Sequence, residues 1–428
     1  MMVGAGRVEG RVAGNGQTDR PAVLLVMPQP FFRSTGTPMN VRMICAALGD
    51  LGYRVELLTF PFGQELRLPH VVQSEVWGLP GLTRIPIGFS HTKVAYDLLL
   101  AGLVLGRLLR RRYAAVHAVE EAAFFTLPLA RLRGLPAIMD LDSDLAQQLA
   151  DHPSRLARSL APWARRLRRR VLQLSQAALT VAPHLSALVQ RESPTTPAFE
   201  IRDVPLPESL EPVDEAAVAA LRQELALGPG PLAVYTGNLD RRQGVPELIE
   251  AWPEVRRACP AAQLLVVGGD PHEVTAYHQL AAEQLAAAGD ERAIIFAGKR
   301  PAAEMPVFMA LADALVSPRL EPLVTPFKIY TYMASGRPIV ATALPTHETV
   351  LGPASAFLVE PTPSGLARGL IAVFGDPCDA AARARAARAL IDQRYNYGMF
   401  RQQLGTLYDH VVATAPAATR PALDELRR

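Results

Sequence analysis

The stretch that decides the fold is VSPRLEPLVTPFKIYTYMASGRPIVATALPTHET, residues 316–349. It opens at the end of an apolar strand, and a loop with two prolines covers residues 317–324. Thr325 followed by Pro326 predicts a helix start, because a hydroxyl caps a helix and proline at its first position loses no hydrogen bond. Gly336 predicts the end of that helix. A second short apolar strand follows, so the stretch indicates one unit of a parallel α/β sheet.

The predicted helix start is also a candidate binding site. A helix N-terminus presents unpaired N–H groups and the positive end of the helix dipole. Lys328 lies in the first turn of the predicted helix, where an ammonium is within reach of a diphosphate. The sequence therefore predicts a phosphate seat at this end of the sheet.

The run MASGRPIVAT, preceded by TPFKIYTYM, resembles the nucleotide-sugar half of glycosyltransferases with the GT-B fold. It is most similar to the retaining family 4 group, and within it to a subgroup that reads T-P-L-K-I-Y-x-Y-M. The resemblance covers nearly the whole chain. The family carries two glutamates before this run, and the matching positions here are Leu323 and Thr331, with Glu321 two positions early.

The resemblance implies an α/β chain with two Rossmann-like domains facing across a cleft and a C-terminal helix that crosses back to the first domain. The expected parts are a flexible tail at 1–20, an acceptor domain at 21–205, a nucleotide-sugar domain at 206–395, a crossover helix at 396–413 and a tail at 414–428.

Composition limits the alternatives. The 428 residues are 49% hydrophobic and 20% charged, which predicts two globular domains with ample cores. A net charge of +3 does not indicate a nucleic-acid partner. The three cysteines are scattered, which predicts reduced thiols and a cytoplasmic protein. We expect no secretion signal within 1–20 and no membrane span, although the protein can lie peripherally on the inner face of a membrane.

The loop TGNLDRRQG at 236–244 resembles the family's G-R-L-x-x-x-K-G loop, whose Arg and Lys clamp the donor diphosphate. Asn238 and Gln243 occupy those two positions here. We expect Lys328 and the amides near Gly237 to stabilise the diphosphate instead, with Arg241 as a further cation. Solvated arginines are the alternative, and we favour that alternative for Arg242.

Other residues complete the predicted donor site. Gly298 and Lys299 resemble the loop that cups the nucleotide base, and Glu321 is expected to hold ribose or sugar hydroxyls. The predicted donor-binding residues are Gly237, Asn238, Arg241, Gln243, Gly298, Lys299, Arg319, Thr325, Pro326, Lys328 and Thr331.

The predicted acceptor site lies at strand ends of the first domain. Asp142 occupies the position where the family has a histidine, and it is expected to orient or deprotonate an acceptor hydroxyl. The predicted catalytic residues are Asp142, His117 and Glu321. The predicted acceptor-binding residues are Ser34, Thr35, Gly36, Glu120 and Asp140. A packed structural histidine is the alternative for His117. The short Asp-Leu-Asp pattern is a weak metal signal, and we expect no metal and no cofactor beyond the nucleotide sugar.

The segment 155–170 contains seven arginines interleaved with Leu156, Leu160, Trp163 and Leu167. We interpret it as a pair of basic amphipathic helices. Such a surface suits anionic lipid headgroups, whereas the alternative is a solvated basic face.

The sequence therefore predicts a glycosyltransferase that moves a sugar from a nucleotide sugar to a polysaccharide or lipid-linked acceptor, with retention of configuration. The alternatives are a non-catalytic GT-B protein that binds a nucleotide or a partner, or an epimerase or phosphorylase on the same scaffold.

Overall fold

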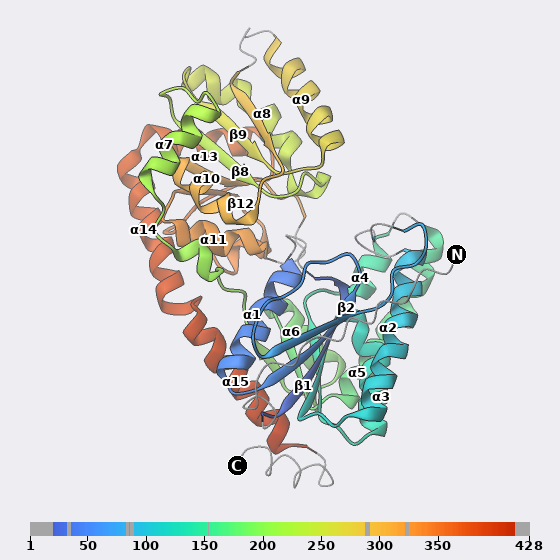
Figure 1. Cartoon of the computed structure of the whole chain (residues 1–428). Helices are drawn as coiled ribbons and strands as arrows, with labels where there is room; N and C mark the ends of the chain where they lie inside the picture. The colour runs from blue at the N-terminus through green and yellow to red at the C-terminus, as the bar shows by residue number, and fades with distance from the viewer. Residues whose placement is uncertain are drawn as a thin grey trace, which may run out of the picture. The chain divides into compact units, whose positions relative to one another are not determined.

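The computed structural model describes residues 20–31, 36–82, 85, 90–152, 154–286, 292–321 and 325–415. The chain forms two compact units (Figure 1). The first unit contains the chain up to Leu179, Ser186–Phe199 and everything from Gln403 onward, and the second contains Thr180–Leu185 and Glu200–Gln402. Each unit is built around one parallel sheet.

The sheet of the first unit has seven strands in the order β3-β2-β1-β4-β5-β6-β7. Its strands are β1 (Ala22–Pro30), β2 (Arg54–Phe60), β3 (Val71–Glu75), β4 (Ala115–Val119), β5 (Ala137–Leu141), β6 (Ala177–Thr180) and β7 (Ala198–Glu200). All residues of β4 and β5 are buried, as expected for a parallel sheet that is covered on both faces.

The helices of the first unit are α1 (Gly36–Asp50), α2 (His91–Arg110), α3 (Ala123–Leu132), α4 (Leu145–Ala150), α5 (Arg155–Leu174) and α6 (Pro183–Glu192). Helix α3 packs between α2 and α5, so these three helices lie side by side (Figure 1). None of the helices in the described ranges combines the length and the apolar character that crossing a bilayer would require.

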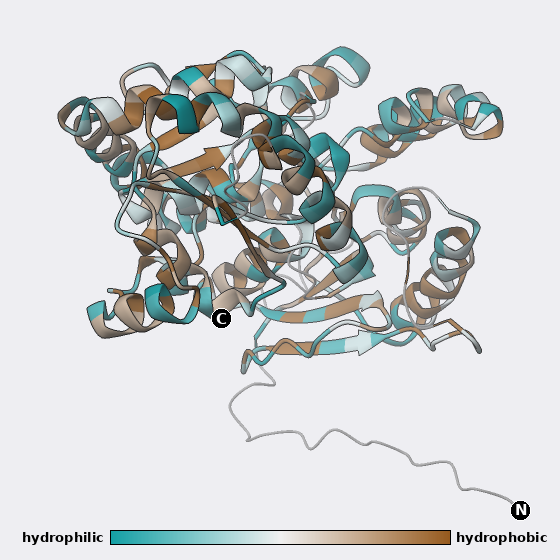
Figure 2. Ribbon diagram, turned by 90° about the horizontal axis from the view of Figure 1, so that it is seen from above, coloured by the Kyte–Doolittle hydropathy of each residue, from teal (hydrophilic) through white to brown (hydrophobic). Residues whose placement is uncertain are grey.

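The sheet of the second unit has six strands in the order β10-β9-β8-β11-β12-β13. Its strands are β8 (Leu232–Thr236), β9 (Gln263–Val267), β10 (Ile294–Gly298), β11 (Ala314–Ser317), β12 (Ile339–Thr342) and β13 (Phe357–Val359). Its helices are α7 (Glu215–Glu224), α8 (Val245–Ala258), α9 (Pro271–Leu285), α10 (Met305–Leu311), α11 (Phe327–Ser335), α12 (Pro345–Glu348), α13 (Pro363–Gly375) and α14 (Pro377–Arg394). Figure 2 shows hydrophobic residues concentrated in strands and in parts of the helices.

Both sheets reverse their strand order once. In the first unit the chain turns from β1 outward to β3 and then returns to β4 on the other side of β1. The second unit repeats this pattern at β8 and β11. In open parallel sheets, ligands bind beyond the carboxyl ends of the strands where the order reverses. The topology therefore points to the β1/β4 and β8/β11 edges, and the two parallel sheets confirm the predicted α/β class.

Helix α15 (Tyr397–Ala413) begins in the second unit and belongs to the first from Gln403 onward, as the crossover prediction required. Tyr408 anchors it there. Its hydroxyl lies 2.9 Å from Nδ1 of His117, a fully buried residue of β4, and Nε2 of that histidine lies 3.0 Å from Oδ2 of Asp140. The Tyr408 ring also packs against Tyr53, with 5.4 Å between ring centroids.

Three parts of the chain differ from the prediction. The edge strand β3 has no predicted counterpart. The basic segment was predicted to be a pair of helices but forms the single helix α5, with Pro162 inside it. Proline removes one backbone hydrogen bond there. The helix nevertheless continues, because buried alanines before and after Pro162 pack against the rest of the unit. Strand β13 and helices α13 and α14 had no predicted counterpart.

We expect Tyr408→Phe to lower the free energy of unfolding by ~1–3 kcal/mol, because Nδ1 of the buried His117 loses its hydrogen-bond partner while the ring contacts remain. Urea denaturation of the full chain measures this. Tyr395→Phe is the matched control, since that hydroxyl has only a long 3.4 Å contact with Arg202. An equal effect of both variants would show that the Tyr408 hydroxyl does not anchor α15.

Candidate active site

Glycines form the floor of the β8/β11 edge. Gly237 and Gly268 have φ values of 141° and 123°, which side chains rarely adopt. A Cβ on Gly268 would lie 1.8 Å from the carbonyl oxygen of Gly237, so no other residue fits. The Gly268 amide in turn donates to Gly298, at 2.8 Å. The ends of β8, β9 and β10 are therefore joined by bare backbone, which allows a ligand to approach closely.

The loops after β8 and β11 pack on each other. Gly244 has a φ of 74°, and a Cβ there would lie 1.8 Å from the carbonyl oxygen of Pro318. The Leu320 amide donates to the Arg242 carbonyl at 3.0 Å. The predicted diphosphate loop at 236–244 and the start of the 316–349 stretch therefore meet at one place.

Lys328 lies in the first turn of α11, and its Nζ is 4.0 Å from the centroid of the Tyr235 ring. A Cβ on Gly237 would lie 2.7 Å from that Nζ, so the amine lies against the glycine floor. The Nζ is buried and has no hydrogen-bond partner within the described ranges. Burial, together with the nearby Arg319 guanidinium, lowers the pKa of Lys328 to about 7.

Arg319 is the second cation at this edge. Its Nε donates to the backbone carbonyl of Glu321 at 3.1 Å. Burial, followed by the charge of Arg242, lowers the pKa of Arg319 below its usual range. Two desolvated cations, whose pKa values are both lowered by burial and by a neighbouring positive charge, are costly unless an anion joins them. The arrangement favours a ligand with negative charge.

The predicted cation Arg241 points elsewhere. It forms a bidentate contact with Glu247 of α8, at 2.6 and 2.5 Å, and its side chain is 63% exposed. Arg242 pairs with Asp240, at 2.8 Å. Both of these arginines therefore have a carboxylate, unlike Lys328.

Tyrosines hold α11 against the end of β8. The Thr236 amide donates to the Tyr332 hydroxyl at 2.9 Å, and the Tyr235 hydroxyl donates to the Asn238 carbonyl at 2.5 Å. These bonds fix the ring over which Lys328 lies and the backbone of the loop beside it.

Sequence reasoning missed His347, which is fully buried beneath this edge. Its Nδ1 donates to the Thr342 carbonyl at 2.7 Å, and its Nε2 lies 3.0 Å from the Ser317 hydroxyl. Burial lowers its pKa to about 4, so the ring is neutral at pH 7. His347 joins the ends of β11 and β12. In the sequence, its position soon after the MASG run was the signal that could have marked it as part of the site.

Thr325 does not cap α11 as predicted. Pro326 is the N-cap residue, and no side chain caps the helix. The Thr325 hydroxyl donates instead to the Thr346 carbonyl at 2.7 Å, because α12 offers a buried acceptor beside it. This contact ties the start of α11 to α12 and leaves the first amides of α11 without a side-chain cap.

The remaining predicted donor residues lie around this edge. Lys299 and Glu321 are exposed, and Gln243 ends the short 3-10 helix η3 (Arg241–Gln243). The Thr331 hydroxyl donates to the Lys328 carbonyl at 2.8 Å within α11. Leu323, the match to the first family glutamate, lies outside the described residues.

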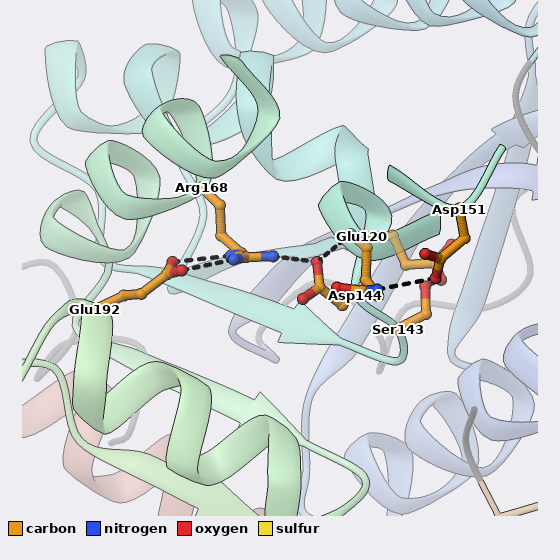
Figure 3. A network of polar contacts seen from close by, with 7 residues as sticks. Glu120, Ser143, Asp144, Asp151, Arg168 and Glu192 are labelled. Carbon is orange, nitrogen blue, oxygen red and sulfur yellow. Dashed lines mark hydrogen bonds and ion pairs between the residues drawn. The ribbon is translucent and has the colours of Figure 1, made fainter. Parts of the chain in front are cut away.

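The β1/β4 edge of the first unit carries a carboxylate held by two side chains. Glu120 follows β4 with a φ of 49°, a left-handed conformation that is uncommon for a residue with a side chain. Its Oε2 accepts from Nε2 of Gln29 at 3.0 Å. Its Oε1 accepts from the Ser143 hydroxyl at 2.6 Å, and Figure 3 shows Glu120 and Ser143. Sequence reasoning missed Gln29 and Ser143, which follow strands and carry no motif.

Two predicted residues lie beneath this edge. His117 is a packed structural histidine and not an exposed catalytic one, since both of its ring nitrogens have partners. Burial lowers its pKa to about 3. Burial and the charge of Glu120 raise the pKa of Asp140, so both groups resist ionisation.

The other predicted residues of the first unit lie in different places. Asp142 is 8% exposed at the end of β5. Gly36 begins α1, whereas Ser34 and Thr35 lie outside the described residues.

Glu121, the next residue, forms an ion pair with Lys93 of α2. Asp97, on the same helix as Lys93, lies close enough for the Glu121 charge to raise its pKa. Burial and the Glu121 charge raise the pKa of Asp97 to about 8.

In the part of the chain that the structure describes, no group of three or more His, Cys, Asp or Glu residues is arranged to hold a metal ion.

Two families match the chain. Glycosyl transferases group 1 matches residues 230–376, and the glycosyl transferase 4-like domain matches residues 35–207. A GDP-mannose-dependent alpha-(1-6)-phosphatidylinositol monomannoside mannosyltransferase of Mycobacterium tuberculosis is 29% identical over 212 residues, which are 49% of this chain and 52% of that protein. The chain therefore spans about half the length of this curated relative.

Many solved structures share the fold, including the following two. The sucrose-phosphate synthase of Thermosynechococcus elongatus has a TM-score of 0.74 at 21% identity, covering 92% of this chain and 100% of that chain. The HepE protein of Anabaena in complex with UDP-glucose has a TM-score of 0.68 at 17% identity, covering 91% and 100%. At these identities the likeness concerns the fold.

We expect Lys328→Met to raise the free energy of unfolding of the unliganded protein by ~1–2 kcal/mol at pH 7, because a buried ammonium is replaced by an apolar chain of similar length. The unfolded state binds the Lys328 proton up to about pH 10.5, whereas the folded state releases it near pH 7. Wild-type stability should therefore rise with pH across this window, and the difference from the variant should shrink. Urea denaturation at pH 7 and pH 9.5 measures this, and a destabilised variant at pH 7 would contradict the account.

Proposed function

We propose that this chain, which belongs to the glycosyltransferases with the GT-B fold, binds a nucleotide diphosphate sugar at the β8/β11 edge and transfers its sugar to a lipid-linked or polysaccharide acceptor. The observation that carries the proposal is the buried Lys328 amine, which has no hydrogen-bond partner in the described residues and lies beside Arg319 and the glycine floor. A diphosphate matches this site because it brings the negative charge that the two cations lack.

The relatives suggest which donors to test. GDP-mannose is the first candidate, because the Mycobacterium tuberculosis relative is named as dependent on it. UDP-glucose is the second, because the Anabaena protein of similar fold was solved with it. The proposed acceptor class is a lipid-linked glycan, for which phosphatidylinositol monomannoside is the test compound.

In the proposed reaction the bond between the sugar anomeric carbon and the diphosphate oxygen breaks, and that oxygen keeps the electron pair. Lys328, Arg319 and the amides near Gly237 stabilise the charge that develops there. The acceptor hydroxyl forms the new bond and passes its proton to the departing diphosphate oxygen on the same face. Asp142 orients that hydroxyl, and Glu321 holds donor hydroxyls. We propose retention through front-face attack, as the family resemblance implies, with no metal required.

Helix α5 is the proposed contact with an anionic membrane surface. Leu156, Trp163 and Leu167 are 60%, 68% and 41% exposed and form one stripe along the helix. Beside the stripe, a hollow of about 580 Å³ is lined by Arg166, Arg169, Arg170, Gln173, Glu192 and Pro194. Exposed apolar side chains flanked by arginines favour the headgroup region of a bilayer that contains anionic lipid. We therefore propose a cytoplasmic protein that lies peripherally on the inner face of the membrane.

A non-catalytic nucleotide-binding protein is the second candidate. The family's clamp residues are replaced by Asn238 and Gln243, and its second glutamate by Thr331. In that case the chain would bind the nucleotide at Lys328 without turning over its sugar.

We expect GDP or UDP to bind the full chain with uptake of about one proton at pH 8. The free Lys328 is mostly neutral above pH 7, whereas a bound diphosphate favours its ammonium form. The dissociation constant should be flat below about pH 7 and then rise up to about tenfold per pH unit. Calorimetry in buffers of different ionisation enthalpy measures the proton count.

Lys328→Met should abolish that proton uptake and weaken binding at pH 7. The matched control is Lys299→Met, an exposed lysine of the same unit, which should keep the proton uptake. Failure of GDP, UDP and ADP to bind a folded sample would contradict the proposed donor site.

We expect the chain to bind vesicles of phosphatidylcholine containing phosphatidylinositol, and to bind pure phosphatidylcholine much less. Replacing Arg166 and Arg170 with Gln should weaken binding about fivefold per residue, at ~1 kcal/mol each. Trp163→Ala should weaken it further, and Arg257→Gln on α8 is the control. Vesicle co-sedimentation at low salt measures this, and the absence of binding by wild type there would contradict the membrane proposal.

A further inference from the structure

Helix α5 carries one charged side chain on its buried side. Arg168 is 4% exposed, whereas its other arginines are exposed. The buried neighbours on the helix are small or apolar, namely Ala157, Ala161, Ala164, Val171 and Leu172. A guanidinium in this position loses its water, so it must be matched by acceptors inside the protein.

Two carboxylates accept hydrogen bonds from the Arg168 guanidinium (Figure 3). Nε and one terminal nitrogen of Arg168 donate to Glu192 at the end of α6, at 2.9 and 2.6 Å. The other terminal nitrogen donates to Oδ1 of Asp144. Only the planar fork of arginine offers two donors to one carboxylate and a third to another. The residue type therefore follows from the need to join two separate segments.

Asp144 stands at the end of the loop that leaves β5. Its Oδ1 also accepts from the Gln147 amide at 3.0 Å and so caps α4. Ser143, the residue before it, donates to Glu120 at 2.6 Å, and Glu120 also accepts from Gln29. A continuous chain of contacts thus leads from Arg168 to the carboxylate at the β1/β4 edge.

We propose that Arg168 is a positioning residue for the acceptor side of the reaction. By holding Asp144, it fixes the Ser143 hydroxyl and, through it, the orientation of the Glu120 carboxylate and the loop that contains Asp142. The inference rests on the proposed function, because it assigns that edge to the acceptor. It also joins the two sides of α5: the exposed side is the proposed membrane contact, and the buried side holds the acceptor loop.

Three variants separate positioning from general stability. Asp144→Asn keeps an oxygen that caps α4 and weakens the contact with Arg168. Glu192→Gln weakens the two-donor contact on the other side of Arg168, away from the loop. Arg168→Lys keeps the charge but loses the fork. All three keep the side chain close to its original size, and none lies in the donor unit.

Two measurements use the full chain. The first is hydrogen–deuterium exchange of residues 141–151 without any ligand. The second is transfer from GDP-mannose to phosphatidylinositol monomannoside in vesicles, with kcat and the KM of each substrate determined separately. We expect Asp144→Asn and Arg168→Lys to exchange faster in this segment and to lose about tenfold or more in kcat/KM for the acceptor. Donor KM should stay within about twofold. Glu192 also borders the hollow beside the proposed membrane contact, so Glu192→Gln is compared by exchange alone, and its exchange in residues 141–151 should stay near wild type.

Equally faster exchange of residues 141–151 in Asp144→Asn and Glu192→Gln would overturn the proposal, because the network would then serve stability alone. Unchanged exchange and kinetics in Asp144→Asn would also overturn it. If wild type transfers no mannose to this acceptor, the proposed reaction fails, and the exchange comparison still decides whether Arg168 holds the loop.

Discussion

The Lys328 ammonium lies 4.0 Å from the centroid of the Tyr235 ring, and the charged group that further lowers its pKa is another cation, Arg319. Much of the second unit's site follows from this arrangement. The glycine at 237 leaves room for the amine, and the bond from Thr236 to Tyr332 holds α11 against β8. A cation kept dry without a counter-charge costs stability, so its retention indicates a ligand that supplies the missing charge.

The two units share the same kind of strand order, but the side chains at the edges where that order reverses carry opposite charges. At the β8/β11 edge the side chains near the floor are cations, and carboxylates pair with arginines farther out. At the β1/β4 edge Glu120 stands at the strand end, and Gln29 and Ser143 orient it without neutralising it. Parallel sheets provide similar edges, so the side chains that follow each strand set the chemistry.

The sequence predicted the parts of the fold that large apolar residues and glycines mark. The end of α11 at Gly336 and the short apolar strand after it, β12, lie where expected. Helix α14 was missed because its buried side consists mainly of alanines, which leave no apolar stripe to read. At the site, Lys328 and the glycine at 237 were predicted from their motif. Thr325 was assigned to capping because its real acceptor lies 21 positions away, and Arg168 looked like one more exposed arginine until the fold brought Asp144 and Glu192 to it.

The most direct test of the central claim is an NMR titration of lysine side chains. The chain contains only three lysines, so labelling the lysine Cε gives three signals, and the Lys328 signal is identified by its loss in Lys328→Arg. The account predicts that this signal titrates near pH 7 in the free protein and at a clearly higher pH when GDP or UDP is bound. A Lys328 signal that titrates near 10.5, or that does not respond to either nucleotide, would contradict it.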